Sequence, residues 1–281
     1  MVESSGLLNR RTGLNLYRGF ESPPLRHRPK MRLARFTLAA LAAPILLAQS
    51  ATPPTGTTSP ISTDRPAVTD SSVVVPQGSL QAENGIEVTW LGSNRSWDLP
   101  ETLVRVGVAP TTELRLTAPD YFSGVVSGFG DTAIGVKQQL LARGFDVSLV
   151  VSLSLPTGAG AISSHGYDPF VQLPWSRSLS KNWTVAGMLS VYWPTEAGRR
   201  NTTGESTFLF DRQLTNRWDA FVEYAGDFPE RGGPRHLLHI GAAFKPSPSQ
   251  QIDVHLGAGL SAAAGDFLGA GYSFRLQAFH R

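Results

Sequence analysis

Apolar and polar residues alternate strictly along residues 145–155. One parity is entirely apolar, comprising Phe145, Val147, Leu149, Val151, Leu153 and Leu155, whereas the other is mostly small and polar. A period of two is the repeat of a β-strand whose two faces meet different environments. The stretch is longer than the roughly 5–6 residues of an ordinary strand and matches the roughly 9–11 residues that cross a bilayer. It therefore predicts a membrane-spanning strand.

The same alternation recurs from residue 78 to the C-terminal end. Further strands are predicted near residues 80–90, 102–108, 113–118, 131–140, 169–175, 183–193, 203–212, 218–224, 238–244, 252–260 and 272–276. The strand at 169–175 is the weakest, because Pro169 and Pro174 have no N–H to donate to a ladder. The strand at 203–212 has no clear inner and outer face. No stretch after the predicted signal peptide shows a comparable helical period.

The connections between these predicted strands alternate in length. Every second connection is short, as at 109–111 and 142–144, and the others are mostly longer and rich in Gly, Pro and Asn, as at 156–167. Short periplasmic turns and long external loops are typical of bacterial outer-membrane barrels. Closure also removes the exposed strand edges that an open sheet would leave. We therefore predict an all-β fold, an antiparallel transmembrane β-barrel of about 12 strands over residues 78–279.

The first residues of the chain have a different pattern. A basic segment at 31–35 precedes an apolar run at 36–48 and small residues near 51. This layout predicts a signal peptide over residues 31–51, with a buried helix as the alternative. Residues 1–30 are expected to be a disordered or mis-assigned N-terminal extension, and residues 52–77 a linker and periplasmic N-terminal segment.

Composition and charge change this picture little. The chain has no cysteine, which excludes disulfides and thiolate metal sites. Its net charge is +3, but much of the basic charge lies in the first 35 residues and the remainder is net acidic. We therefore expect no nucleic-acid partner.

The polar parity of the predicted strands carries charges of both signs. By parity, the side chains expected to line the lumen are Glu83, Glu87, Arg105, Glu113, Arg115, Lys137, Asp146, Glu223, Asp253, His255 and Arg275. One interpretation is a set of salt bridges that fills a narrow barrel. The other is a polar pathway or pocket that selects a solute, since a barrel of this size lies between side-chain-filled and open kinds.

Several short motifs give the chain a family resemblance. They are Thr63–Pro66, Val75–Gly78 with Gln81–Gly85, Leu103–Gly107, Glu113–Leu116, Gly128–Asp131 with Gly135–Lys137, and Leu155–Gly158. In this order and spacing they resemble a family of bacterial outer-membrane proteins named for the phenol meta-cleavage degradation pathway and described as transporters. The resemblance implies an outer-membrane location and a transport role. Gly271–Leu276 also resembles the C-terminal signal of the outer-membrane assembly machinery, although the chain ends Phe279-His280-Arg281.

The motif Asp64-Arg65-Pro66 lies before the first predicted strand. Pro66 and the surrounding Thr, Asp and Ser residues favour irregular structure. The favoured interpretation is a periplasmic clip in which Arg65 pairs with a turn or lumen carboxylate. The alternative is an N-terminal segment folded into the barrel as a plug.

An enzyme is the weakest functional class. A barrel lipid hydrolase needs a serine beside a histidine, but His239 and His255 face inward with Gly241 and Gly257 at the next inward positions. Asp253 and His255 alone offer too few ligands for a metal, and no cofactor is expected. We therefore predict a channel or transporter for small solutes, with aromatic or hydrophobic ones as candidates. A non-conducting structural barrel is the alternative. Its expected partners are outer-membrane lipid and the assembly machinery.

Overall fold

The computed structural model describes residues 8–9, 14–15 and 59–277. The predicted signal peptide lies outside the described residues, as does almost all of the extension. Within that extension, β1 (Leu8–Asn9) and β2 (Leu14–Asn15) form a short antiparallel pair. No helix in the described part of the chain is long and apolar enough to cross a bilayer.

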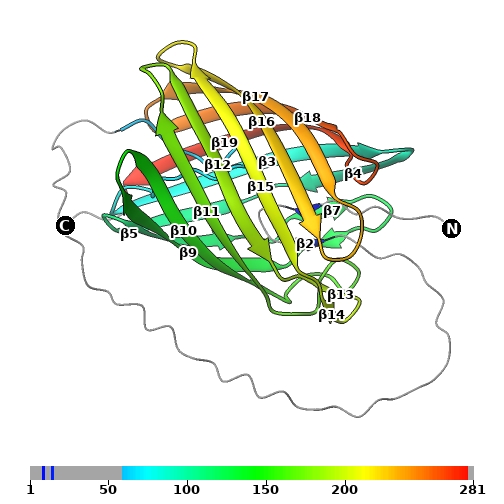
Figure 1. The fold of residues 1–281 in the computed structure, drawn as a ribbon. Helices are drawn as coiled ribbons and strands as arrows, with labels where there is room; N and C mark the ends of the chain where they lie inside the picture. Colours follow the sequence, from blue (N-terminus) through cyan, green and yellow to red (C-terminus); the bar gives the residue numbers. More distant parts are fainter. Residues whose placement is uncertain (1–7, 10–13, 16–58, 278–281) are drawn as a thin grey trace, which may run out of the picture. The chain divides into compact units, whose positions relative to one another are not determined.

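Within residues 59–277, twelve antiparallel strands form a closed barrel (Figure 1). The barrel strands are β3 (Ser79–Leu91), β5 (Leu103–Ala109), β6 (Thr112–Thr117), β9 (Thr132–Ala142), β10 (Phe145–Leu155), β11 (Asp168–Ser178), β12 (Trp183–Tyr192), β15 (Thr203–Gln213), β16 (Trp218–Pro229), β17 (Arg235–Ser247), β18 (Gln250–Gly259) and β19 (Asp266–Gln277). Each strand pairs with its neighbour in the chain order. The barrel closes where β19 pairs with β3, from Gln277 opposite Ser79 to Asp266 opposite Trp90. The predicted twelve-stranded antiparallel barrel is confirmed.

Short strands extend the barrel at the end that carries the longer connections. β4 (Asn94–Leu99) pairs with the end of β3, and β7 (Tyr121–Ser123) joins β4 to β8 (Gly128–Phe129). β13 (Thr195–Glu196) and β14 (Arg199–Arg200) form a separate hairpin between β12 and β15. The alternation of short turns and long loops therefore holds, with secondary structure inside several of the loops.

The faces of the barrel are inverted relative to a soluble sheet. In β10, Ser148 has 0 % exposure, whereas Val151 on the opposite parity is 50 % exposed. The same arrangement runs through the other strands, with Leu114, Val136, Leu189, Ile240 and Leu268 exposed on the outside. An apolar outer band with a polar interior is the arrangement of a barrel embedded in lipid.

Several strands differ from their predicted limits. β11 runs through both prolines. Pro174 lies where the ladder to β10 is interrupted, between Gln172 and Trp175, and Pro169 is the second residue of the strand, opposite Leu153. β15 has a definite facing, with Thr203, Glu205 and Thr207 buried and Phe208 and Phe210 exposed. β16 and β17 extend beyond their predicted ends, so the loop between them is only residues 230–234.

Candidate functional site

The interior of the barrel is occupied by residues 59–77, which we call the lumenal segment. It enters beside the turn between β17 and β18, where the Ile61 amide donates to the Pro248 carbonyl at 2.7 Å. It leaves where the Gly78 amide donates to the Gly107 carbonyl at 2.8 Å and the chain continues into β3. Between these points Asp64 and Arg65 are buried, with exposures of 2 % and 4 %. Of the two arrangements considered for Asp64-Arg65-Pro66, the structure has the segment folded inside the barrel.

Asp64 is the first anchor of the lumenal segment. Its carboxylate lies 2.7 Å from Arg115 Nη2, 3.3 Å from Arg105 Nη1 and 3.2 Å from Lys137 Nζ. Burial alone would raise the pKa of Asp64, but the three cations outweigh burial and hold this pKa well below its ordinary range. The Asp64 carboxylate therefore stays charged, and its anchor holds, in moderately acidic solution.

The cations around Asp64 are themselves held by carboxylates on the barrel wall. Arg105 Nε and Nη2 donate to Glu113 at 2.8 and 2.9 Å, and Nη1 donates to Glu83 at 3.0 Å. Glu83 also accepts from the backbone amides of Asp64 and Arg65 at 2.9 and 3.0 Å. Charges of both signs are thus paired and hydrogen-bonded in a place where an unpaired charge would be costly.

Arg65 is the second anchor. Its guanidinium forms an ion pair with Glu101, and its Nη2 lies 3.2 Å from Asp253 Oδ1. Two glycines opposite each other on β3 and β19, Gly85 and Gly271, leave the space that this guanidinium fills. A Cβ at either position would overlap Arg65. Only glycine at both positions gives the guanidinium this room against the wall.

Glu223 on β16 is the third anchor. Its carboxylate accepts hydrogen bonds from the backbone amides of Val68 and Thr69 at 2.8 and 2.7 Å, and from Thr69 Oγ1 at 2.6 Å. Thr69 Oγ1 also lies 2.5 Å from Thr207 Oγ1 on β15. The tip of the segment is therefore fixed to the side of the barrel opposite Arg105.

The segment returns along a different part of the wall. Ser72 contacts β10 and β11, because its carbonyl accepts from Ser148 Oγ at 2.7 Å and its hydroxyl meets Ser176 Oγ at 2.7 Å. The Val75 amide donates to Glu113 at 2.7 Å. Polar contacts therefore hold the segment along its whole length, on strands from most of the circumference.

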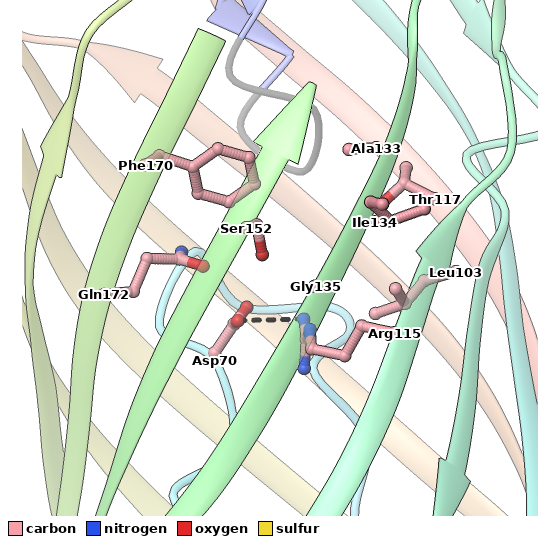
Figure 2. Close-up of a pocket in the computed structure, with 10 residues that line it drawn as sticks. All are labelled: Asp70, Leu103, Arg115, Thr117, Ala133, Ile134, Gly135, Ser152, Phe170 and Gln172. Carbon is pink, nitrogen blue, oxygen red and sulfur yellow. Dashed lines mark hydrogen bonds and ion pairs between the residues drawn. The ribbon is translucent and has the colours of Figure 1, made fainter. Parts of the chain in front are cut away.

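A small pocket lies between the segment and the wall. Figure 2 shows its lining, in which Asp70 points toward Arg115 while Phe170, Ser152 and Gln172 lie on neighbouring strands. The pocket offers about 10 Å³ to the centres of water molecules, roughly the room for one water. Phe170 stacks on Tyr192 with ring centroids 5.5 Å apart, and with Ala133 they form an apolar cluster. A second apolar cluster, of Ala225, Leu237 and Phe267, packs against Val68 of the segment.

Most of the side chains predicted from parity to line the lumen lie together here. Glu83, Arg105, Glu113, Lys137, Glu223, Asp253 and His255 are buried inside the barrel, with Glu87, Arg115 and Arg275 on the same inner parity. Arg275 Nη2 donates to the Ser59 carbonyl. Asp146 lies apart from them, exposed at the start of β10 beside a short turn.

Sequence reasoning missed several buried polar residues. Glu101 was placed in a loop, and Glu205, Asp227 and Arg235 were omitted because the facing of β15 and the extents of β16 and β17 were not predicted. His239 does not meet a serine, since its Nδ1 faces Glu223 and its Nε2 faces His255. Within the described residues, no group of three acidic or histidine side chains is arranged to hold a metal ion.

A closed twelve-stranded barrel with an apolar outside and a charged interior has the fold of an outer-membrane channel. Solved structures agree with this class. An outer-membrane channel from Pseudomonas putida F1, of the group COG4313, is 11 % identical, with a TM-score of 0.55 over 73 % of this chain and 98 % of that one. The KdgM porin is 13 % identical, with a TM-score of 0.50 over 71 % and 99 %. The NanC porin is 10 % identical, with a TM-score of 0.51 over 70 % and 100 %.

The family follows from the sequence itself. Residues 63–276 match the model of the family described as "Putative MetA-pathway of phenol degradation". The match covers well over half of the chain, so the protein belongs to this family, as the motifs indicated. No curated protein matches the chain.

Proposed function

We propose that this protein is a channel for small solutes in a bacterial outer membrane, and that the lumenal segment controls passage. The observation that carries the proposal is the way the lumen is filled. A separate segment, held by hydrogen bonds and ion pairs, occupies it, whereas a purely structural barrel could be filled by side chains of its own strands. Such a segment can move without breaking the sheet, because the strands beyond β3 hold it mainly through their side chains and not through their backbone.

Aromatic or hydrophobic solutes are the class that we propose for this channel. The stacked Phe170 and Tyr192 rings with Ala133 give the interior an apolar surface next to the pocket. The pocket now has room for about one water, so a ring would pack there once the lumenal segment has moved, with Gln172, Thr117 and Ser152 placed to bond its polar substituents. The phenol pathway in the family's description is consistent with this class. Export through a cleaved signal peptide at residues 31–51 remains part of the proposal, as does a non-enzymatic role.

The test uses a disulfide across the close contact between Thr69 and Thr207. The chain has no cysteine of its own, so Thr69→Cys with Thr207→Cys introduces one defined pair, and the 2.5 Å separation of the hydroxyls suits a disulfide. In planar bilayers we expect the oxidised variant to conduct several-fold less than the same protein after reduction. The Thr69→Cys single variant is the control and should not respond to the reductant. A folded barrel without conductance or solute flux in either state would overturn the channel and leave the closed structural barrel.

A further inference from the structure

Two arginines stack on aromatic rings at the end of the barrel that carries the short turns. Arg177 lies near the end of β11, with its guanidinium carbon 5.1 Å from the centre of the Phe145 ring on β10. Arg212 lies near the end of β15, with its guanidinium carbon 5.1 Å from the centre of the Trp183 ring on β12. Both arginines are exposed. A guanidinium is attracted to the face of a ring, so each one is held along the wall of the barrel.

The register places both arginines on the outer face of the barrel. Arg177 lies directly opposite Val185, and Arg212 lies directly opposite Trp183. Opposite residues of an antiparallel pair share a face, and Val185 and Trp183 share the outer parity of β12 with the exposed Leu189. Both guanidiniums therefore lie at the aromatic edge of the apolar band, where an outer-membrane barrel meets the lipid headgroups.

The nearest carboxylates along the strands are on the other face. Asp146 lies opposite Ser176, whose hydroxyl contacts the lumenal segment inside the barrel. Asp211 precedes Arg212 in β15 and therefore has the inner parity. Within the described residues, neither Arg177 nor Arg212 forms an ion pair or a side-chain hydrogen bond. Each guanidinium therefore keeps its five N–H donors for a partner outside the barrel.

Further basic residues lie in the turns on the same side. The turns that follow β9, β11 and β15 carry Arg143, Lys181 and Arg217, and all three are exposed. The short turns at 110–111 and 248–249 hold no charged residue. A general girdle of cations would follow the whole rim. The outward positive charge is instead gathered over β9, β10, β11, β12, β15 and β16, which are neighbours in the barrel (Figure 1), and this favours an anionic partner on that side.

A row of aromatic rings covers the wall beside these cations. The Phe145 and Trp175 ring centroids are 6.1 Å apart, and the Trp175 and Phe208 centroids are 6.2 Å apart. Phe208 in turn lies 5.1 Å from Phe210. The row runs from β10 to β15 on the apolar outer face, so it offers a continuous surface on which acyl chains can pack directly below a headgroup.

The separation of the two guanidiniums indicates the kind of headgroup. Phe145 and Trp183 lie on β10 and β12, with β11 between them. The guanidiniums stacked on these rings are therefore roughly 10 Å apart or more, twice the spacing of neighbouring strands. A hydrogen bond from a guanidinium to a phosphate is only about 2.7–2.9 Å long. One phosphate is too small to bond both cations in these positions, whereas two phosphates joined by a short bridge can reach both.

We propose that Arg177 and Arg212 form a binding site for diphosphatidylglycerol, a phospholipid with two phosphates on one headgroup, in the leaflet that faces the short turns. Each guanidinium binds one phosphate through paired N–H groups, as its planar fork allows. The acyl chains lie along the aromatic row. The site is on the outer wall of the barrel, so it does not depend on whether the lumen conducts.

The experiment measures the lipid that the folded protein retains in detergent micelles, by native mass spectrometry. The probes are diphosphatidylglycerol, and phosphatidylglycerol and phosphatidylethanolamine with one phosphate each. We expect one diphosphatidylglycerol per barrel, bound several-fold more tightly than either of the others and less tightly at high salt, where charges are screened. Arg177→Gln and Arg212→Gln should each weaken this binding several-fold. Lipid A, which also carries two phosphates but belongs to the other leaflet, is the competing probe.

Arg95→Gln is the matched control. The Arg95 guanidinium also stacks on a ring, with its carbon 5.7 Å from the centre of the exposed Trp97 ring, but at the end of the barrel with the long loops. This variant should bind diphosphatidylglycerol like the parent. Arg177→Lys and Arg212→Lys keep the charge and lose the planar fork, so they should bind with intermediate affinity, and they replace any glutamine variant that does not assemble.

Three results would each overturn the site. They are equal retention of the lipids with one and two phosphates, an equal loss of binding in Arg95→Gln, and tighter binding of lipid A than of diphosphatidylglycerol. No readout in this experiment uses conductance. A barrel that retains the lipid but does not conduct overturns the channel alone, and a conducting barrel without the lipid preference overturns the lipid site alone.

Discussion

At the scale of single residues, the interior depends on pairs that lie far apart in the sequence. Arg65 meets Asp253 and His255, which follow it by 188 and 190 residues. Parity placed Glu83, Arg105, Glu113 and Lys137 on the polar face, because alternation decides which face a side chain occupies. Alternation does not predict which of these side chains form ion pairs with one another. Those contacts depend on the stagger between neighbouring strands and on the path of the irregular lumenal segment. The pairing of Arg65 with a carboxylate was predictable from charge, but its carboxylate Glu101 was not.

The two glycines beside Arg65 give a prediction at this scale. Alanine at Gly85 would place its Cβ over the Arg65 guanidinium and the Glu101 carboxylate, the far ends of two flexible side chains, whereas alanine at Gly271 would also meet the backbone carbonyl of Asn84 at 2.7 Å. In Gly85→Ala the side chains should move and the strands should stay, so the barrel should assemble normally. We expect a thiol introduced by Ala67→Cys, at a half-buried position of the segment beside Arg65, to react with a thiol reagent several-fold faster at neutral pH in the Gly85→Ala protein.

Gly204→Ala is the matched control, because nothing lies within 4 Å of a Cβ added there. It should leave the reaction rate of Ala67→Cys unchanged. An unchanged reaction rate of Ala67→Cys in Gly85→Ala would show that the guanidinium does not hold this part of the segment.

At the scale of the strand, alternation was sufficient to predict most of the barrel. β10 occupies Phe145–Leu155, the limits read from its pattern. The extensions β4, β7 and β8 were not predicted, because a strand surrounded by water on a loop needs no alternation. The ends of β16 and β17 were not predicted either, because the charged residues Asp227 and Arg235 are typical of a loop. In the structure these two residues lie opposite each other on the two strands and form an ion pair inside the barrel.

The outer face of β10 gives a second prediction. Leu149 is exposed on the apolar side near the middle of the strand. Arginine there should cost about 2–4 kcal/mol, the range found for a charge at the bilayer midplane. We expect Leu149→Arg to reduce the fraction of barrel that stays folded on a heat-modifiable gel and to lower its unfolding midpoint in urea.

Leu149→Met keeps the volume and the apolar character, and it should assemble like the parent. If Leu149→Arg assembles equally well and unfolds at the same urea concentration, this face does not meet hydrocarbon.

At the scale of the whole molecule, the barrel and its lumenal segment are separable in their hydrogen bonding. The backbone N–H and C=O groups of the strands pair with those of the neighbouring strands around the closed barrel. This pairing is needed in a membrane, because an unpaired backbone polar group is costly in hydrocarbon. The segment contributes no strand to the barrel. The sequence predicted the twelve-stranded barrel, because its strands repeat the same alternation of apolar and polar residues. The path of the segment could not be predicted, because a run of Thr, Ser, Asp and Pro follows no period.

Deletion of residues 59–75 tests this separation. The charges that the segment covers, such as Arg105 and Glu113, would then meet water in an open lumen, where a charge is well solvated. We expect the shortened protein to remain a heat-modifiable barrel, with a conductance several-fold above that of the parent. Failure to form a barrel in vesicles would show that the segment is needed for closure.

The place that receives Arg65 also sets an order of events during assembly. Gly85 comes from the first strand of the barrel, whereas Gly271 and Asp253 come from its last two. The site that binds the guanidinium therefore forms only when β19, the last strand, pairs with β3, the first. Binding of Arg65 is then necessarily a late step of assembly, and the reactivity of a thiol at the tip of the segment would report when the barrel has closed.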